Sequence, residues 1–154
     1  MKIIELNKIP GIHENAKFEE AYLQYEQLLS ELRKRELTEA LAMSINKDIQ
    51  EINSTETSGY EMRKLITKLQ TRMIKLLEKE IKLVPRNYYR NLWLALGMSA
   101  FGVPIGVAIG LSLHNLAFLG IGLPIGLALG IAVGSSMDKK AFAEGRQMDV
   151  EIKY

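Results

Sequence analysis

Between Asn91 and Met137 the chain reads NLWLALGMSAFGVPIGVAIGLSLHNLAFLGIGLPIGLALGIAVGSSM. This stretch holds no lysine, arginine, aspartate or glutamate, and every such residue of the chain lies at or before Arg90 or at or after Asp138. A hydrocarbon core about 30 Å thick is crossed by about 20 helical residues. The stretch is long enough for two crossings, so we predict membrane spans at about 92–113 and 116–137.

Inside this stretch one glycine pattern occurs twice. The copies are GVPIGVAIG at 102–110 and GLPIGLALG at 122–130. Glycine at every fourth position lies on one helix face and allows a second backbone to approach closely. The predicted helix-packing residues are Gly102, Gly106, Gly110, Gly122, Gly126, Gly130 and Gly134. One zipper could close the hairpin itself, with Gly102 and Gly106 level with Gly126 and Gly122, or both could face neighbouring protomers.

Each copy carries a proline at its third position, Pro104 and Pro124. Proline has no backbone N–H and leaves the carbonyl four residues earlier, here that of Ala100 or Gly120, without its helical donor. We therefore predict a kink in each helix. In the alternative arrangement Pro124 lies in the first turn of a shorter second helix, and residues 116–123 form a re-entrant loop among protomers.

Cationic and amphipathic aromatic residues flank the uncharged stretch. Such residues favour the headgroup layer of a bilayer. The predicted interfacial anchors are Arg86, Tyr88, Tyr89, Arg90, Trp93, Lys139 and Lys140. Because the midpoint of the stretch has no lysine or arginine, the positive-inside rule places both termini in the cytoplasm.

The polar residues near the midpoint are Ser112, His114 and Asn115. An ionisable group inside an apolar run is a functional candidate, and these side chains could line a lumen. A hydrated turn on the far side of the membrane is the favoured interpretation, since a His-Asn pair at an apex meets water at the interface.

The segment before the uncharged stretch has helical periodicity. Apolar residues recur at spacings of three and four, first at Phe18, Tyr22, Tyr25, Leu29 and Leu32 and then, one residue out of phase, at Leu37, Leu41, Ile45, Ile49 and Ile52. This pattern predicts one long helix from about Glu14 to Ile52, with a kink or break after Glu36. A second helix follows, with Ser58 and Glu61 as a capping box, and should run to Val84.

The two predicted helices carry opposite charge. Residues 14–52 hold nine acidic and five basic side chains, and residues 60–91 hold nine basic and three acidic side chains. We therefore expect them to pair as an antiparallel hairpin, chiefly through their apolar stripes because surface ion pairs contribute little. The basic excess could also hold anionic lipid headgroups. It does not by itself indicate a nucleic-acid partner.

The predicted fold class is all-α. It comprises a cytoplasmic antiparallel helical hairpin (1–87), a two-helix glycine-zipper transmembrane hairpin (88–138) and a cytoplasmic C-terminal tail (139–154). Short alternating patterns at Lys2–Leu6 and Asp149–Tyr154 are strand-like, and we expect these two ends to pair as a small sheet, within one chain or between protomers.

The sequence contains no recognisable motif of catalysis or metal binding. Gly120, Gly122 and Gly126 imitate a dinucleotide loop, but the strand and the acidic residue that such a loop needs are missing. The chain has no cysteine, and His13 and His114 are about a hundred positions apart, so no group of metal ligands is indicated. We expect no catalytic residues, no cofactor and no metal site, and therefore not an enzyme.

The segment Gly102–Gly134, with its G-x-P-I-G-x-A-x-G copies, and the following Met137-Asp138-Lys139-Lys140 and Glu144-Gly145-Arg146-Gln147 resemble the bacterial glycine-zipper membrane proteins. The resemblance does not extend to residues 14–84. It implies close helix packing, homo-oligomerisation and, in some members, channels or pores, in a bacterial inner membrane.

The sequence is compatible with two functions. The first is an integral membrane protein that homo-oligomerises through its glycine-zipper helices and forms a channel or pore. The alternative is a non-conducting anchor or scaffold whose cytoplasmic helices bind a protein partner. In both, the expected partners are the lipid bilayer and further copies of the chain.

Overall fold

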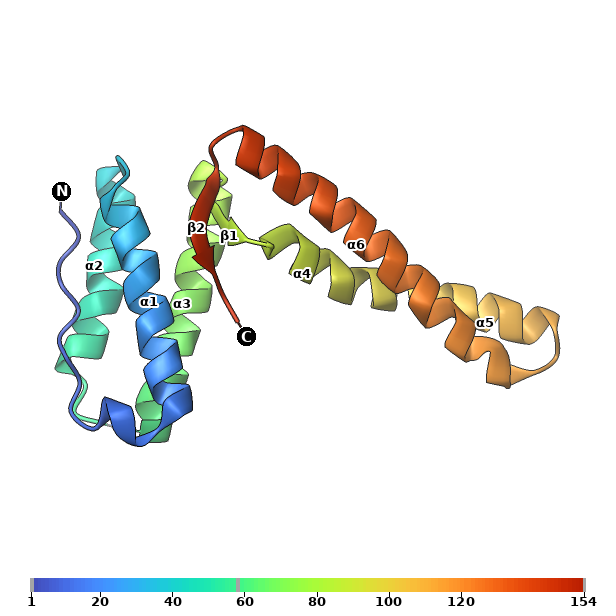
Figure 1. Ribbon diagram of the computed structural model, residues 1–154, viewed down its shortest axis with the longest axis horizontal. Helices are drawn as coiled ribbons and strands as arrows, with labels where there is room; N and C mark the ends of the chain where they lie inside the picture. Colours follow the sequence, from blue (N-terminus) through green and yellow to red (C-terminus); the bar gives the residue numbers. More distant parts are fainter. Residues whose placement is uncertain (1, 58, 154) are drawn as a thin grey trace. The chain divides into compact units, whose positions relative to one another are not determined.

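The computed structural model describes residues 2–57 and 59–153 (Figure 1). Its elements are α1 (Ala16–Arg33), α2 (Glu39–Ser54), α3 (Gly59–Ile81), β1 (Val84–Arg86), α4 (Tyr88–Gly97), a π-helical turn (Met98–Gly102), α5 (Val103–Ser112), α6 (Leu119–Ala143) and β2 (Gln147–Glu151), with 3-10 turns at Ile12–Glu14 and Leu116–Phe118. In this described part the only strands are β1 and β2, so the predicted all-α class is confirmed. The described chain divides into two compact units, Met1–Val84 with Met148–Tyr154, and Pro85–Gln147.

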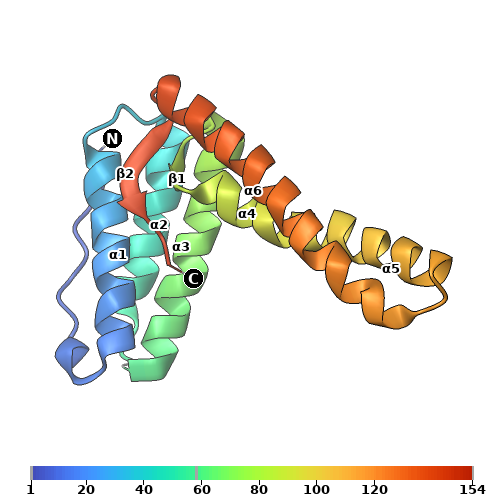
Figure 2. The ribbon, with the colours of Figure 1, turned by 45° about the vertical axis from the view of Figure 1, so that its right-hand side comes forward.

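Helices α1, α2 and α3 pack side by side around one apolar core (Figures 1 and 2). Each helix buries an apolar stripe at helical spacing, namely Phe18, Tyr22, Tyr25, Leu29 and Leu32 from α1, Leu41, Ile45, Ile49 and Ile52 from α2, and Met62, Ile66, Leu69, Met73 and Leu77 from α3. Leu37, the first residue of the second predicted stripe, lies before α2 and is half-buried. Burial of these side chains is the main stabilising contribution to this unit. We call α1–α3 the N-terminal bundle.

The single helix expected over 14–52 is instead two helices, so the predicted helical hairpin is a bundle of α1, α2 and α3. The helix is interrupted at residues 34–38, where the change of stripe register had indicated a kink or break. Thr38 caps α2, its hydroxyl accepting from the backbone N–H of Leu41 at 3.4 Å. At the other end, α3 stops at Ile81 because Lys82 is left-handed, with φ of 56°. The predicted cap Ser58 lies outside the described residues.

The N-terminal segment is bonded to α2 by two asparagine side chains, and its described residues form no strand. Asn46 accepts from the backbone N–H of Ile4 at 2.9 Å and donates to the carbonyl of Lys2 at 3.0 Å. Asn53 repeats this arrangement with Asn7 at 2.9 Å and Glu5 at 3.0 Å. The two asparagines are seven residues apart and hence on one face of α2. They satisfy the backbone of a segment that has no secondary structure of its own.

The expectation that the two ends of one chain pair with each other is wrong. β2 pairs with β1 in a parallel ladder, whereas the N-terminal segment bonds to the asparagine side chains of α2. Beyond the ladder, β2 and the residues after it lie along α1. The N–H of Asp149 donates to Glu31 at 3.3 Å and that of Lys153 donates to Gln24 at 3.1 Å.

In the second unit, α4, the π-helical turn and α5 run antiparallel to α6 (Figures 1 and 2). We call residues 88–143 the helical hairpin. Pro104 lies in the first turn of α5, directly after the π-helical turn, so the missing N–H falls where the regular ladder is already interrupted. Pro124 lies inside α6, which begins at Leu119 and is continuous through it. The alternative in which Pro124 starts a shorter helix after a re-entrant loop is therefore wrong.

Burial in the hairpin is the reverse of that in a soluble core. The buried residues of α5 are Gly106 and Gly110, and those of α6 include Gly122, Gly126, Gly130 and Gly134. Large apolar side chains are exposed instead, among them Phe101, Val107, Leu111, Ile121, Leu123 and Leu129. In the described part of the chain, two helical segments, Tyr88–Ser112 and Leu116–Ala143, are long and apolar enough to cross a membrane, with only 22% and 17% of their most apolar windows buried.

Candidate functional site: the glycine seam of the hairpin

Glycines from the two arms of the hairpin meet backbone to backbone. A Cβ added to Gly126 would lie 2.5 Å from the amide nitrogen of Gly102, and one added to Gly122 would lie 2.6 Å from the Cα of Gly106. Real Cβ atoms essentially never come within 3.0 Å of such atoms. Within the one chain, Gly102 and Gly106 lie level with Gly126 and Gly122, as in the first of the two arrangements that the sequence left open.

The seam continues toward the charged end of the hairpin. A Cβ on Gly130 would meet the carbonyl carbon of Trp93 at 2.9 Å, and one on Gly134 would meet the Cα of Arg90 at 2.5 Å. At the opposite end the fit is looser, because a Cβ on Gly110 would meet nothing closer than 3.4 Å. The tight part of the seam therefore excludes any side chain larger than hydrogen, while its end near the turn does not.

Gly97 is a seam residue that the sequence pattern missed. A Cβ there would lie 2.8 Å from the Cα of Gly130. Gly97 precedes Gly102 by five positions, which puts it off the four-residue period. The π-helical turn Met98–Gly102 accommodates one extra residue and so brings Gly97 back to the face of Gly102. The sequence feature that could have identified Gly97 is a glycine five positions before the first copy of the proline-containing repeat.

Asp138 closes the charged end of the hairpin. It is 7% exposed, and its carboxylate oxygens accept from the backbone N–H groups of Tyr89 at 3.0 Å and Arg90 at 2.9 Å. The residue that should cap α4, Asn87, is left-handed with φ of 57° and makes no side-chain cap. A carboxylate from α6 thus caps the first turn of α4, where the helix dipole also favours negative charge. No local sequence pattern predicted this capping role of Asp138.

The predicted interfacial anchors gather near this end of the hairpin. The rings of Tyr88 and Tyr89 meet edge to face, with centroids 5.2 Å apart. Tyr89 is buried and Trp93 half-buried, whereas Arg90 is exposed. Arg86 is exposed on β1, and Lys139 and Lys140 are exposed on α6, where Lys140 Nζ lies 4.0 Å from Glu144 Oε1. The structure brings Tyr89 and Arg90 next to Asp138 through the cap.

The lumen or turn candidates all lie at the turn. Ser112 is the last residue of α5, and His114 is left-handed with φ of 51°. Asn115 caps the following 3-10 turn, its side-chain oxygen accepting from the N–H of Ala117 at 3.0 Å. All three side chains are exposed at this end of the hairpin, and the structure does not bring them to the seam.

The N-terminal bundle contains a buried ionisable cluster of its own. Asp48 on α2 is almost fully buried and pairs with Arg72 on α3. Burial raises the pKa of Asp48 above its ordinary value, although the charge of Arg72 acts in the opposite direction. Burial, and after it the charge of Asp48, raises the pKa of Tyr25, whose hydroxyl is buried without a hydrogen-bond partner among the described residues.

No group of histidine, aspartate or glutamate side chains that could hold a metal ion is present among residues 2–57 and 59–153. Comparison of the chain with protein-family models, with curated proteins and with solved structures gives no match. The structural class is therefore defined by the fold alone. It is a helical protein with a bundle and a glycine-seamed hairpin of two segments long enough to span a membrane.

Proposed function

We propose that this chain is an integral membrane protein whose helical hairpin anchors the N-terminal bundle to a bilayer. The observation that carries the proposal is the inverted burial of the hairpin, in which glycines are buried and large apolar side chains are exposed along both arms. Monomeric soluble proteins rarely expose apolar patches larger than about 600 Å². Lipid tails are the solvent in which such a surface is stable.

The glycine seam supports this proposal independently. Between helices in lipid there is no hydrophobic drive, so association depends on close backbone packing at small residues. The contacts of Gly102, Gly122 and Gly126 have that character. The hairpin is therefore expected to be stable within one chain, before any second copy is bound.

An anchor is favoured over a pore by the position of the polar groups. Ser112, His114 and Asn115 lie at the turn, and Ser99 in the π-helical turn donates its hydroxyl hydrogen to the carbonyl of Ala95 at 3.0 Å, so a lumen between the helices would have few polar side chains to face water. The N-terminal bundle is then the part of the molecule that is free to meet a protein partner. With lysine and arginine flanking both ends of the hairpin, we propose that both termini lie in the cytoplasm and the turn on the far side.

The experiment is flotation of the purified protein with phosphatidylcholine vesicles before and after an alkaline carbonate wash. Retention after the wash supports an inserted hairpin, and release by the wash contradicts it. Ion flux through the same vesicles separates the two functions. An anchor predicts no flux above that of protein-free vesicles, whereas flux that scales with protein density would support the channel.

Homo-oligomerisation is the second candidate, and one observation favours it. On α6, small residues that face away from the seam also recur every fourth position, at Gly120, Pro124, Ala128 and Ala132, and all are exposed. A Cβ on Gly120 would meet nothing within 4 Å. This outer face could receive a helix of a second copy, with or without a pore. Mass measurement of the detergent-solubilised protein tests it, since a monomer contradicts assembly.

A further inference from the structure

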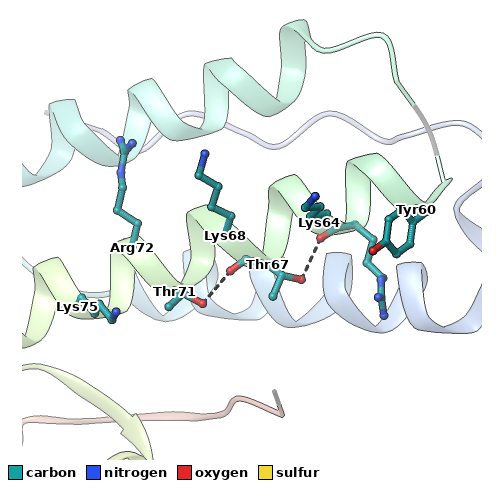
Figure 3. Close-up of a pocket in the computed structure, with 8 residues that line it drawn as sticks. Tyr60, Lys64, Thr67, Lys68, Thr71, Arg72 and Lys75 are labelled. Atoms are coloured by element: carbon teal, nitrogen blue, oxygen red, sulfur yellow. Dashed lines mark hydrogen bonds between the residues drawn. The ribbon is translucent and has the colours of Figure 1, made fainter.

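The face of α3 that points away from the core of the bundle is strongly basic. Figure 3 shows its side chains along a shallow groove on one helix, lined by Tyr60, Arg63, Lys64, Thr67, Lys68, Thr71, Arg72 and Lys75. These positions follow the spacing of three and four residues that defines one helix face. The lining contains five cations and no carboxylate. We call these eight residues the α3 basic face.

Most of this charge is not neutralised within the chain. Among the described residues, no salt bridge involves Arg63, Lys64, Lys68 or Lys75. Arg72 pairs with Asp48, yet its side chain remains 51% exposed. The acidic excess of residues 14–52 therefore does not cover the basic excess of α3, contrary to what a hairpin held by opposite charges would require.

The threonine hydroxyls between the cations are already bonded within α3. The cations are therefore the groups of this face that would meet a negatively charged ligand. Thr67 and Thr71 donate their hydroxyl hydrogens to the carbonyls of Arg63 and Thr67 on their own helix, each at 2.9 Å (Figure 3). At the end of the face, Tyr60 is 62% exposed, and the Arg63 guanidinium lies 5.6 Å from its ring centroid. An exposed amphipathic ring beside cations suits a surface with both charged and apolar layers.

Chain connectivity places anionic headgroups close to this face if the hairpin is inserted. α3 ends at Ile81 and the first membrane-spanning segment begins at Tyr88, so only residues 82–87 separate them. With a rise of about 1.5 Å per residue, Lys75 lies roughly 10 Å of helix from the end of α3. A surface potential falls off within a Debye length of about 10 Å, so the remaining cations sense it only if α3 lies along the surface.

We propose that the α3 basic face binds anionic phospholipid headgroups and so holds the N-terminal bundle against the membrane that the hairpin spans. This inference rests on the proposed membrane insertion of the hairpin. The row of cations on α3 would recognise the ligand, which is a phosphate diester headgroup of net negative charge. Zwitterionic headgroups do not satisfy it, since they carry no net charge.

The test uses the full chain in vesicles of phosphatidylcholine, with or without about 30% phosphatidylglycerol. Lysine acylation by a water-soluble reagent is followed site by site by mass spectrometry. In the anionic vesicles we expect the rates at Lys64, Lys68 and Lys75 to fall about threefold or more, and to recover at about 0.5 M salt because the attraction is screened. Lys47, exposed on α2, and Lys8, exposed in the N-terminal segment, serve as internal controls and should not change.

A matched pair of variants sharpens the test. The double variant that carries Lys64→Gln and Lys68→Gln should show weaker protection of Lys75 in anionic vesicles, whereas the single variant Lys47→Gln should not. Circular dichroism checks that both variants retain their helices. If the double variant loses its helices as well as the protection of Lys75, the salt titration of the wild-type protein decides instead.

The outcomes separate this inference from the proposed function. Equal acylation rates in neutral and anionic vesicles would overturn headgroup binding, even if the protein floats with both. Protection by soluble inositol phosphate in neutral vesicles, to the same extent as by anionic lipid, would assign the face to a free phosphate and also overturn it. Protection that depends on protein density in neutral vesicles would indicate a second copy instead.

Discussion

The carboxylate of Asp138 accepts a hydrogen bond from the backbone N–H of Tyr89 at 3.0 Å, across 49 positions of sequence. This contact ties the last part of α6 to the first turn of α4. The seam glycines Gly130 and Gly134 lie between it and the middle of the hairpin. The Asp138 carboxylate at one end of the hairpin and the seam glycines along its length therefore fix the register of the two arms.

Removing the Asp138 carboxylate should loosen the start of α4. For Asp138→Ala we expect a loss of about 1–2 kcal/mol in the stability of the hairpin, the range for a lost helix cap. Amide hydrogen exchange in detergent or vesicles should speed up first at Tyr89 and Arg90. Asp149→Ala, a change on the exposed part of β2, is the control. Unchanged exchange at Tyr89 would contradict the capping role.

Two neighbouring glycines of α6 provide a matched comparison. Gly122→Ala places a methyl group 2.6 Å from the Cα of Gly106, whereas Gly120→Ala places one in open space. We therefore expect Gly122→Ala to separate the arms and Gly120→Ala to leave them in place, with a small gain from better helix propensity. Spin labels on Val107 and Ile121 would report the separation. Equal distances in both variants would rule out a seam at Gly122.

The hydroxyl of Tyr25 is predicted to cost stability. It is buried without a hydrogen-bond partner among the described residues, and a buried unsatisfied polar group costs about 1–3 kcal/mol. Tyr25→Phe should therefore raise the free energy of unfolding of the bundle by about 1 kcal/mol. Tyr22→Phe is the control, because the Tyr22 hydroxyl donates to the carbonyl of Asn7 at 3.2 Å and its removal should be destabilising. A destabilised Tyr25→Phe would reveal an unseen partner, such as water.

The Asp48–Arg72 pair predicts how stability varies with pH. Because burial raises the pKa of Asp48 in the folded state, the folded chain holds its proton more tightly than the unfolded chain does. This contribution to stability is complete below the ordinary pKa of 3.8 and is lost as pH rises through the folded pKa. Urea unfolding at several pH values should show a smaller loss of stability between about pH 4 and pH 7 for Asp48→Asn than for the wild type.

Arg72→Gln is the complementary variant. It leaves a buried carboxylate without its cation, which should cost about 3 kcal/mol near pH 7 and less at acid pH, where Asp48 is protonated. Asp48→Asn should cost far less at pH near 7, because the half-exposed Arg72 then turns to water. If the two variants lost equal stability at neutral pH, the pair would not be acting through the buried charge.

The sequence predicted the elements whose periodicity is regular. The stripes of α1–α3 followed from spacing alone, because they depend on a single helix period. The level positions of Gly102 and Gly126 needed, besides that spacing, a turn placed at His114 and Asn115, and were one of two alternatives. The break between α1 and α2 was indicated only as a change of register, since a kinked helix and two helices share that signal.

The features that escaped prediction depend on contacts between distant residues. Gly97 joins the seam only because a π-helical turn adds one residue, and the cap of Asp138 on Tyr89 joins positions that no local pattern connects. Likewise, Asn46 and Asn53 resemble ordinary helix residues until the N-terminal segment lies against them. The alternating pattern at the C-terminus predicted a strand but could not identify Val84–Arg86 as its partner.

The central claim is that lipid surrounds the outer face of the hairpin. Because the chain has no cysteine, single cysteines can be introduced at exposed positions such as Val107, Leu111, Ile121 and Leu129, with Leu23 on α1 as a reference outside the hairpin. The measurement is the reaction of each with a membrane-impermeant maleimide in sealed vesicles. The account predicts rapid reaction at position 23 and protection along both arms until detergent is added. Rapid labelling of the arms in intact vesicles, at the rate of position 23, would contradict it.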